Sequence, residues 1–249
     1  MLVASEAEVA VVITVSKIAT KNQERFVKES ILEVQNITKE VNSPEGVLTI
    51  LKDVNLTINS GDVTSIVGPS GSGKTTLLAI MAGLDLPSRG RIMLMGHEIT
   101  AMNEDKRAQV RSNDVGFVFQ SFHLLPRLSA LDNVMLPLEI LGDNNAKKKS
   151  LEALNQIGLE KRVKHLPNQL SGGEKQRVAI ARAMVKQPKI LFADEPTGNL
   201  DKTSTEVISD LLFSINRSFQ TTIVIVTHDL LLAKNCETMH ELDEGSLKC

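Results

Sequence analysis

The sequence predicts an α/β fold built on a parallel β-sheet. Two runs, residues 189–195 and 222–228, are apolar in their central positions. The first ends in Asp194 and Glu195 and the second in His228, whose side chains can act in catalysis. Continuous apolar runs of this kind are typical of strands buried on both faces, and segments with helical periodicity separate them. A third strand-like run, residues 64–67, leads through a glycine-rich loop into a helix. Ligands bind outside the carboxyl ends of such strands, so we expect the functional site there.

The other elements follow from local periodicity and turn residues. Alternating apolar and polar side chains predict strands, apolar residues three and four apart predict helices, and glycine or proline marks their ends, as at Gly158 and Pro188. The expected strands cover residues 31–37, 54–58, 64–67, 91–95, 115–119, 189–195 and 222–228. The expected helices cover residues 75–82, 102–111, 131–141 and 147–157, a segment ending at 186, and one with Val207, Ile208, Leu211, Leu212 and Ile215 on one face.

Composition excludes some classes of function. The 249 residues can bury a full core, and a net charge of −2 gives no electrostatic reason to expect nucleic-acid binding. Cys236 and Cys249 lack the spacing of metal ligands, so reduced thiols in the cytosol are expected. No apolar run reaches the roughly 20 residues that a transmembrane helix needs.

The first 30 residues differ from the rest and are expected to form a poorly ordered N-terminal extension. Their apolar stretch, residues 9–15, is too short to cross a bilayer, and Glu6 and Glu8 stand where a signal peptide would carry basic residues. Three interpretations stay open: a loosely attached arm, an upstream extension from a misplaced start codon, and a membrane-surface segment. The globular part is predicted to begin near Ser30.

The glycine-rich loop fits the pattern G-x-x-x-x-G-K-[ST] between a strand and a helix. Its glycines let successive N–H groups curl toward an anion, and the helix N-terminus adds partial positive charge. Lys74 would bridge the outer phosphates, and the Thr75 hydroxyl is placed to hold Mg²⁺. A plain Gly/Ser turn would not combine all these fixed positions, so the loop predicts a bound nucleoside triphosphate. The expected contacts are Gly68, Pro69, Ser70, Gly71, Ser72, Gly73, Lys74, Thr75 and Thr76.

Two carboxylates end the apolar strand at residues 189–195, where an exposed acidic turn would not be expected. Asp194 can hold Mg²⁺ through water, and Glu195 is placed to orient and deprotonate an attacking water. His228 is expected to contact the γ-phosphate, with a capped strand-end histidine as the alternative, and Gln120 to contact the metal or the water. Such positioning and charge stabilisation account for most of the catalysis of phosphoryl transfer.

In chain order these residues resemble the motifs of an ABC-type ATPase. Residues 68–76 resemble the Walker A motif, Gln120 the Q-loop, 170–176 the LSGGQ signature, 190–195 Walker B, 198–201 the D-loop and His228 the H-loop. A phosphate loop alone would also suit kinases or GTPases, but the Leu-Ser-Gly-Gly-Glu run is close to diagnostic. The resemblance covers residues 31–249, and finer features at 116–120 and 193–201 are similar to the lipoprotein-release and macrolide-export branch.

This resemblance implies a P-loop NTPase (RecA-like) parallel-sheet core with an antiparallel β subdomain and an α-helical subdomain at about residues 121–178. It implies an ATPase subunit at the cytoplasmic face of the inner membrane that couples hydrolysis to movement of a separate integral-membrane permease, without a nucleic-acid partner. Two other classes stay open: a soluble non-transport ABC ATPase acting on nucleic acid or ribosomes, and a module that holds ATP without turnover. The missing coiled-coil insertion, second cassette and basic face argue against the first, and Glu195 and His228 against the second.

A second candidate anion site, formed by Ser171, Gly172 and Gly173, has no triphosphate loop of its own in this chain. Pairing in trans resolves this: two subunits form a homodimer around two ATP molecules, with Asp201 at the seam. One position departs from the family, which usually stacks an aromatic residue on adenine in the first strand region. Val41 follows Glu40 there and the chain has no Tyr, so we expect ATP to bind through its phosphates with weak base selectivity.

The segment after Gln120, residues 121–128, carries more apolar surface than such a loop needs. Phe122, Leu124 and Leu125 either fill the seam between the two subdomains or, with the start of residues 130–138, line a groove for a short helix of the permease. The family resemblance supports the second interpretation.

Overall fold

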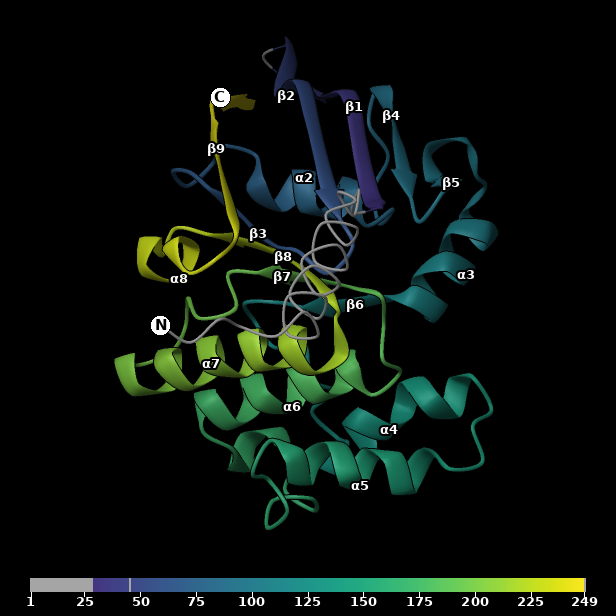
Figure 1. Ribbon diagram of the computed structural model, residues 1–249, viewed down its shortest axis with the longest axis vertical. Coiled ribbons are helices and arrows are strands. Elements are labelled where there is room, and N and C mark those ends of the chain that lie inside the picture. Colours follow the sequence, from purple (N-terminus) through teal and green to yellow (C-terminus); the bar gives the residue numbers. More distant parts are fainter. Residues whose placement is uncertain (1–28, 45, 249) are drawn as a thin grey trace, which may run out of the picture.

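Two β-sheets and a group of helices make up the described part of the chain, residues 29–44 and 46–248, in this computed structural model (Figure 1). Residues 1–28 of the predicted N-terminal extension lie outside the described part of the chain. The predicted α/β fold with a parallel sheet is confirmed.

The first sheet is antiparallel and has the strand order β2-β1-β4-β5. Its strands are β1 (Ser30–Ser43), β2 (Gly46–Asn59), β4 (Arg89–Leu94) and β5 (His97–Glu98). The expected alternation is present, since Leu32 and Val34 in β1 and Val54, Leu56 and Ile58 in β2 are buried. Strand β1 runs further than predicted because its pairing with β2 continues to Ser43 opposite Gly46.

The second sheet holds the strands that were expected to carry the site. Its order is β10-β9-β3-β8-β7-β6, parallel throughout except for the β9–β10 hairpin. The strands are β3 (Val63–Val67), β6 (Val115–Val118), β7 (Ile190–Asp194), β8 (Thr222–Thr227), β9 (Thr238–Asp243) and β10 (Ser246–Lys248). Strands β3, β8 and β7 are direct neighbours, so their carboxyl ends meet at one edge of the sheet.

Side chains on the two faces of the parallel sheet enter two different apolar clusters. Val224 and Val226 of β8 pack with α2 (Lys74–Met81) and the antiparallel sheet, whereas Ile223 and Ile225 pack against α6 (Gly172–Met184) and α7 (Lys202–Phe219). Figure 1 shows α2 beside the upper sheet and α6 and α7 below the strands. Burial on both faces explains why these strands read as continuous apolar runs.

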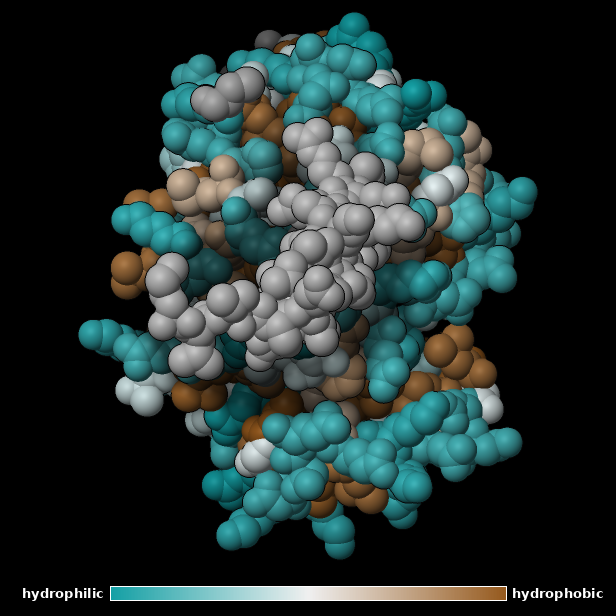
Figure 2. Space-filling model, in the orientation of Figure 1, coloured by the Kyte–Doolittle hydropathy of each residue, from teal (hydrophilic) through white to brown (hydrophobic). Residues whose placement is uncertain are grey.

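A third cluster lies among α4 (Ala130–Ile140), α5 (Ala146–Gln156) and the adjoining face of α6. Its members are Ala130, Val134, Leu154, Leu159, Leu170, Val178 and Ala181. Gly158 has φ of 70° directly after α5, as expected of a residue that ends a helix. The coloured part of the face in Figure 2 is mostly hydrophilic at its rim and has several hydrophobic areas. At the end of α4, Ile140 and Leu141 are exposed.

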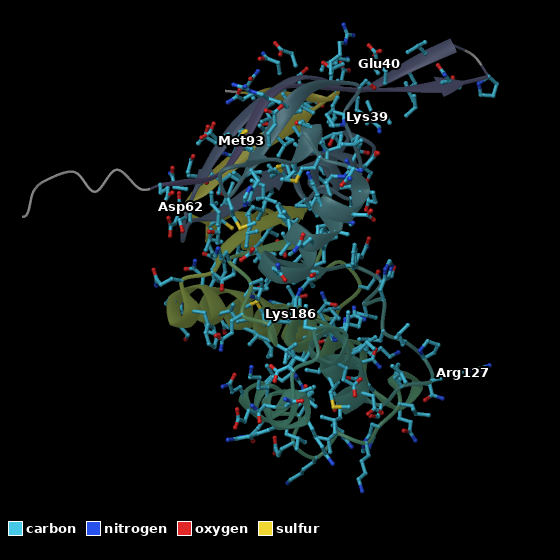
Figure 3. The ribbon with its side chains drawn as sticks, turned by 90° about the vertical axis from the view of Figure 1, so that its right-hand side faces the viewer. Lys39, Glu40, Asp62, Met93, Arg127 and Lys186 are labelled. Carbon is cyan, nitrogen blue, oxygen red and sulfur yellow. The ribbon has the colours of Figure 1, made fainter. Side chains whose placement is uncertain are left out.

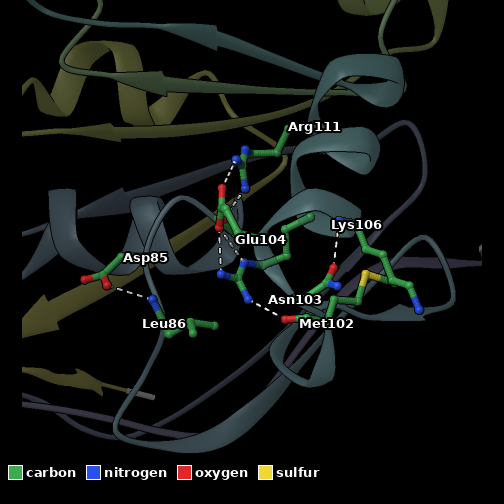
Figure 4. Close-up of polar contacts among 9 residues, drawn as sticks. Asp85, Leu86, Met102, Asn103, Glu104, Lys106 and Arg111 are labelled. Carbon is green, nitrogen blue, oxygen red and sulfur yellow. Dashed lines mark hydrogen bonds and ion pairs between the residues drawn. The ribbon is translucent and has the colours of Figure 1, made fainter.

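The predicted charged surface helix is α3 (Glu104–Asp114), which buries none of its residues. Glu104 accepts hydrogen bonds from Arg107 and Arg111, and Arg111 also donates to the carbonyl of Gly83 beyond α2 (Figure 4). These contacts tie α3 to the loop that follows the phosphate-loop helix. Two 3-10 turns, η1 (Ile99–Ala101) and η2 (Pro167–Gln169), and the short α8 (Leu230–Lys234) complete the elements. Within the described ranges, no helix has the length and apolar character needed to cross a membrane.

Candidate functional site

The glycine-rich loop lies between the carboxyl end of β3 and the start of α2. Gly73 has φ of 102°, and a Cβ there would come within 2.9 Å of the Leu51 side chain and 3.0 Å of the Ile50 carbonyl. A Cβ on Gly71 would instead meet nothing within 4 Å, so the loop is open on that side. Helix α2 begins without a side-chain cap, which leaves the N–H groups of its first turn available to an anion.

Lys74 lies across this loop and is almost completely buried. Its Nζ donates to the carbonyls of Gly68 at 2.8 Å and Pro69 at 2.9 Å, which leaves one N–H of the ammonium for another acceptor. The Ser72 hydroxyl is buried and has no hydrogen-bond partner among the described residues. An uncapped helix, a held cation and an orphaned hydroxyl together fit the phosphate groups of a nucleotide.

Thr75 and Asp194 bring two oxygen atoms together from different elements. The Thr75 hydroxyl donates to Oδ1 of Asp194 at 3.2 Å, across from α2 to the end of β7. Burial raises the pKa of Asp194, and the charge of Glu195 adds to this, whereas the Thr75 hydrogen bond and Lys74 oppose it. Residues 29–44 and 46–248 contain no cluster of three or more His, Cys, Asp or Glu able to hold a metal. A hydroxyl and one carboxylate suit Mg²⁺, which usually keeps several waters and binds substrate phosphates.

Glu195 and His228, predicted from separate strands, are in direct contact. Oε1 of Glu195 lies 3.0 Å from Nδ1 of His228, and Oε2 accepts from the Thr227 hydroxyl at 3.1 Å and the His228 N–H at 3.3 Å. The Glu195 side chain is 14% exposed, whereas His228 is 64% exposed. Sequence reasoning missed Thr227, although its place directly before His228 at a strand end was a usable signal.

Gln120 lies two residues beyond β6 and contacts the segment after Glu195. Its Nε2 is 3.5 Å from Oδ1 of Asn199, and Nδ2 of Asn199 donates to the Gln120 carbonyl at 3.1 Å. A Cβ on Gly198 would come within 2.9 Å of Gln120 Nε2, so Gly198 leaves room for this side chain. The contact with Asn199 was not predicted, and the role of Gln120 toward a metal or water stays a prediction.

The signature residues lie at the start of α6. Ser171 accepts from the Glu174 N–H at 3.2 Å and Glu174 accepts from the Ser171 N–H at 2.9 Å, forming a capping box. A Cβ on Gly173 would come within 2.7 Å of the Ser204 hydroxyl, so this glycine permits the close approach of α6 and α7. Asp201 caps α7 through the Ser204 N–H at 3.0 Å, a bond that lowers the pKa of Asp201.

The two predicted anion sites are not joined within the described part of the chain. No hydrogen bond or ion pair there connects residues 171–173 or Asp201 with residues 68–76. At the position where the family usually stacks an aromatic residue on the base, Val41 pairs with Leu48 across β1 and β2, so both side chains of this pair are aliphatic. Within the described residues, the phosphate loop therefore lies together with Asp194, whereas the second candidate anion site is not connected to the loop by a hydrogen bond or ion pair.

Comparison with known proteins identifies the family. The family described as ABC transporter matches residues 51–198. The chain belongs to the ABC transporter family of ATP-binding proteins. It is 50% identical over 222 residues to the ABC transporter ATP-binding protein YbbA of Escherichia coli K12, covering 88% of this chain and 97% of YbbA. It is 46% identical over 219 residues to the lipoprotein-releasing system ATP-binding protein LolD of Legionella pneumophila strain Lens, covering 87% and 96%.

A solved structure agrees with this assignment. The ATP-binding cassette MJ0796, described as a dimer in a post-hydrolysis state bound to ADP and Pi, has a TM-score of 0.81 and 40% identity, covering 88% of this chain and 97% of that one. The predicted fold class is thereby confirmed. As predicted, the chain is an ATP-hydrolysing nucleotide-binding subunit of the ABC transporter type, and the alternative of an ABC ATPase acting on nucleic acid or ribosomes has no support.

Proposed function

We propose that the chain works as a homodimer that closes over two ATP molecules and moves a separate integral-membrane permease. The observation that carries the proposal is the separation of residues 171–173 from the phosphate loop, since each half-site can then be completed by a second copy. The description of the related cassette MJ0796 as a dimer with ADP and Pi supports this assembly. The proposed location is peripheral, at the cytoplasmic face of the inner membrane, where ATP is available.

Each site residue receives a role in this proposal. Lys74 and the N–H groups of the loop hold the phosphates, and Thr75 and Asp194, with Gln120, would hold Mg²⁺, which when bound offsets the charge on the transferred phosphoryl group. Glu195 accepts the proton of the attacking water. His228 holds the Glu195 carboxylate through Nδ1, at 3.0 Å, and contacts the γ-phosphate in the closed dimer.

The segment after Gln120 is the proposed contact with the permease. Leu124 is partly buried and packs against the cluster among α4, α5 and α6. Leu125 instead is 43% exposed. The neighbouring Arg127 points outward at the edge of the molecule (Figure 3). A short apolar helix of the membrane subunit is therefore the proposed occupant of this edge, consistent with the naming of LolD for a lipoprotein-releasing system.

Co-purification from detergent-solubilised membranes tests the permease contact. We expect Leu125→Ala to reduce capture of the membrane subunit about 30-fold, the effect of losing a hot spot worth about 2 kcal/mol, with basal ATPase activity within about twofold of the parent. Phe219→Ala is the matched control, because Phe219 is exposed to 45% at the end of α7, away from the Gln120 loop. Normal capture by a folded Leu125→Ala would place the contact elsewhere, and an unfolded variant would show that Leu125 belongs to the seam.

A further inference from the structure

The turn directly after Gln120 has a backbone conformation that its residues do not favour. Phe122 has φ of 61° and His123 has φ of 49°. Residues with a Cβ seldom adopt this left-handed region, which glycine and asparagine occupy more readily. Two such residues in succession persist only where their surroundings hold them in place.

Arg182, near the end of α6, supplies one of these restraints. Its guanidinium donates to the Phe122 carbonyl at 2.9 Å and to the His123 carbonyl at 2.6 Å. The planar fork of an arginine can hold two acceptors in a fixed geometry, whereas the ammonium of a lysine is a single point of attachment. Arg182 thus fixes the carbonyls of both strained residues at once.

Other contacts fasten the same loop to the sheet and to α4. The His123 ring stacks on Phe119 with centroids 4.6 Å apart, Phe119 stacks on Phe117 at 5.0 Å, and Phe117 stacks on Phe192 of β7 at 5.6 Å. The buried Asn133 side chain of α4 accepts from the Leu125 N–H and donates to the carbonyls of Leu125, Leu128 and Ser129, which follow the turn. The loop is therefore a rigid connector between the sheet, α4 and α6, and not a free linker.

We propose that Arg182 is a positioning residue that holds the strained turn after Gln120, and with it Gln120, in a fixed place relative to the start of α6. Arg182 and Ser171 are eleven positions apart on one continuous helix, about 16 Å at 1.5 Å per residue. A helix is stiff over that length, so Arg182 fixes the turn after Gln120 at a set distance from the signature residues. The inference rests on the proposed function, in which Gln120 serves the nucleotide of its own subunit and Ser171 that of the partner.

Steady-state ATPase kinetics of the full chain test this proposal. We expect Arg182→Gln to lower kcat about tenfold while KM for ATP stays within about twofold, because the phosphate loop is untouched, and Arg182→Lys to give an intermediate kcat. Adding Phe122→Gly to Arg182→Gln should restore kcat to within about threefold of the parent, since glycine adopts a positive φ without strain. A packing role for Arg182 would not produce this rescue.

Lys186 provides the matched control. It lies two residues beyond the end of α6 (Figure 3), is half-buried, and donates to the backbone carbonyls of Arg111 and Ser112 in the last turn of α3. Lys186→Gln should keep kcat within about twofold. If Gln120→Ala leaves kcat unchanged, the role proposed for Gln120 fails. If Gln120→Ala lowers kcat and Arg182→Gln does not, or if Phe122→Gly gives no rescue, the role proposed for Arg182 is overturned.

Discussion

Replacing Glu195 by glutamine separates the chemistry of the site from its stability. The carboxylate contacts the Thr227 hydroxyl, the His228 N–H and the His228 ring, and an amide of the same shape keeps one acceptor oxygen for these groups. Loss of a hydrogen bond to a charged group costs about 1.5–3 kcal/mol of stability, or less where one partner is exposed as His228 is. At about 2–4 °C per kcal/mol for a chain of this size, the melting temperature should fall by only a few degrees.

Hydrolysis should respond far more strongly. A general base contributes about 10²–10⁴-fold to the rate, equivalent to about 2.7–5.5 kcal/mol. ATP affinity should stay within about threefold, because in the described part of the chain Glu195 contacts Thr227 and His228 and makes no hydrogen bond or ion pair to the phosphate loop. The variant should therefore accumulate as an ATP-bound dimer that cannot turn over.

Phosphate release, equilibrium nucleotide binding and sedimentation of Glu195→Gln with Mg-ATP measure these three quantities. Glu206→Gln, at an exposed position on α7, controls for the loss of one negative charge and should behave as the parent. A Glu195→Gln variant that hydrolyses ATP at more than about a tenth of the parental rate would refute the assignment of the base. A variant that stays monomeric with saturating Mg-ATP would refute the proposed dimer.

Three further predictions concern the other parts of the site. Lys74→Ala should weaken ATP binding about 10–150-fold, the worth of one charge-assisted hydrogen bond, and an unchanged dissociation constant in a nucleotide titration would contradict it. With Val41 in place of an aromatic residue, GTP should be hydrolysed with kcat/KM within about tenfold of ATP, and a thousandfold preference in competition kinetics would mean that another group reads the base. Burial raises the pKa of Asp194, so its ionisation above that pKa costs stability. Without Mg²⁺ and nucleotide, Asp194→Asn should therefore melt higher than the parent at pH 7, with a difference that shrinks toward pH 4, and a lower melting temperature at pH 7 would oppose this.

Much of the fold and site followed from local sequence because the relevant signals are local. Residues 190–193 and 223–226 are apolar on both faces because apolar clusters cover both sides of the sheet, and such continuous apolar runs predict buried strands. The phosphate loop could be predicted because Gly73 combines a positive φ with a close approach to Leu51 and the Ile50 carbonyl, which favours glycine at this fixed position of the motif. Glu195 and His228 end neighbouring strands, so strand pairing brings them together.

The parts that sequence could not predict depend on backbone partners. Strand β9 was missed because Leu242 is its one buried residue, and its pairing with β3 uses main-chain groups that carry no sequence signal. From the sequence, Arg182 is expected to be a surface residue of a helix, yet it donates to the carbonyls of Phe122 and His123, which are distant in the chain. The positive φ of Phe122 could not be predicted either, because the position is not a glycine or asparagine, the residues that usually indicate this conformation.

The contact between α6 and α7 constrains how the proposed dimer can work. Ser171 begins α6, Asp201 caps α7 through Ser204, and Gly173 brings the two helix starts so close that a Cβ would lie 2.7 Å from the Ser204 hydroxyl. We therefore expect the residues proposed to meet the partner's ATP and those proposed to form the seam to move as one body. Since each subunit contributes that body to the other's site, closure at one nucleotide alters the seam that both sites share. In the proposed dimer we therefore expect closure at the two ATP sites to be coupled through the packing of these two helices.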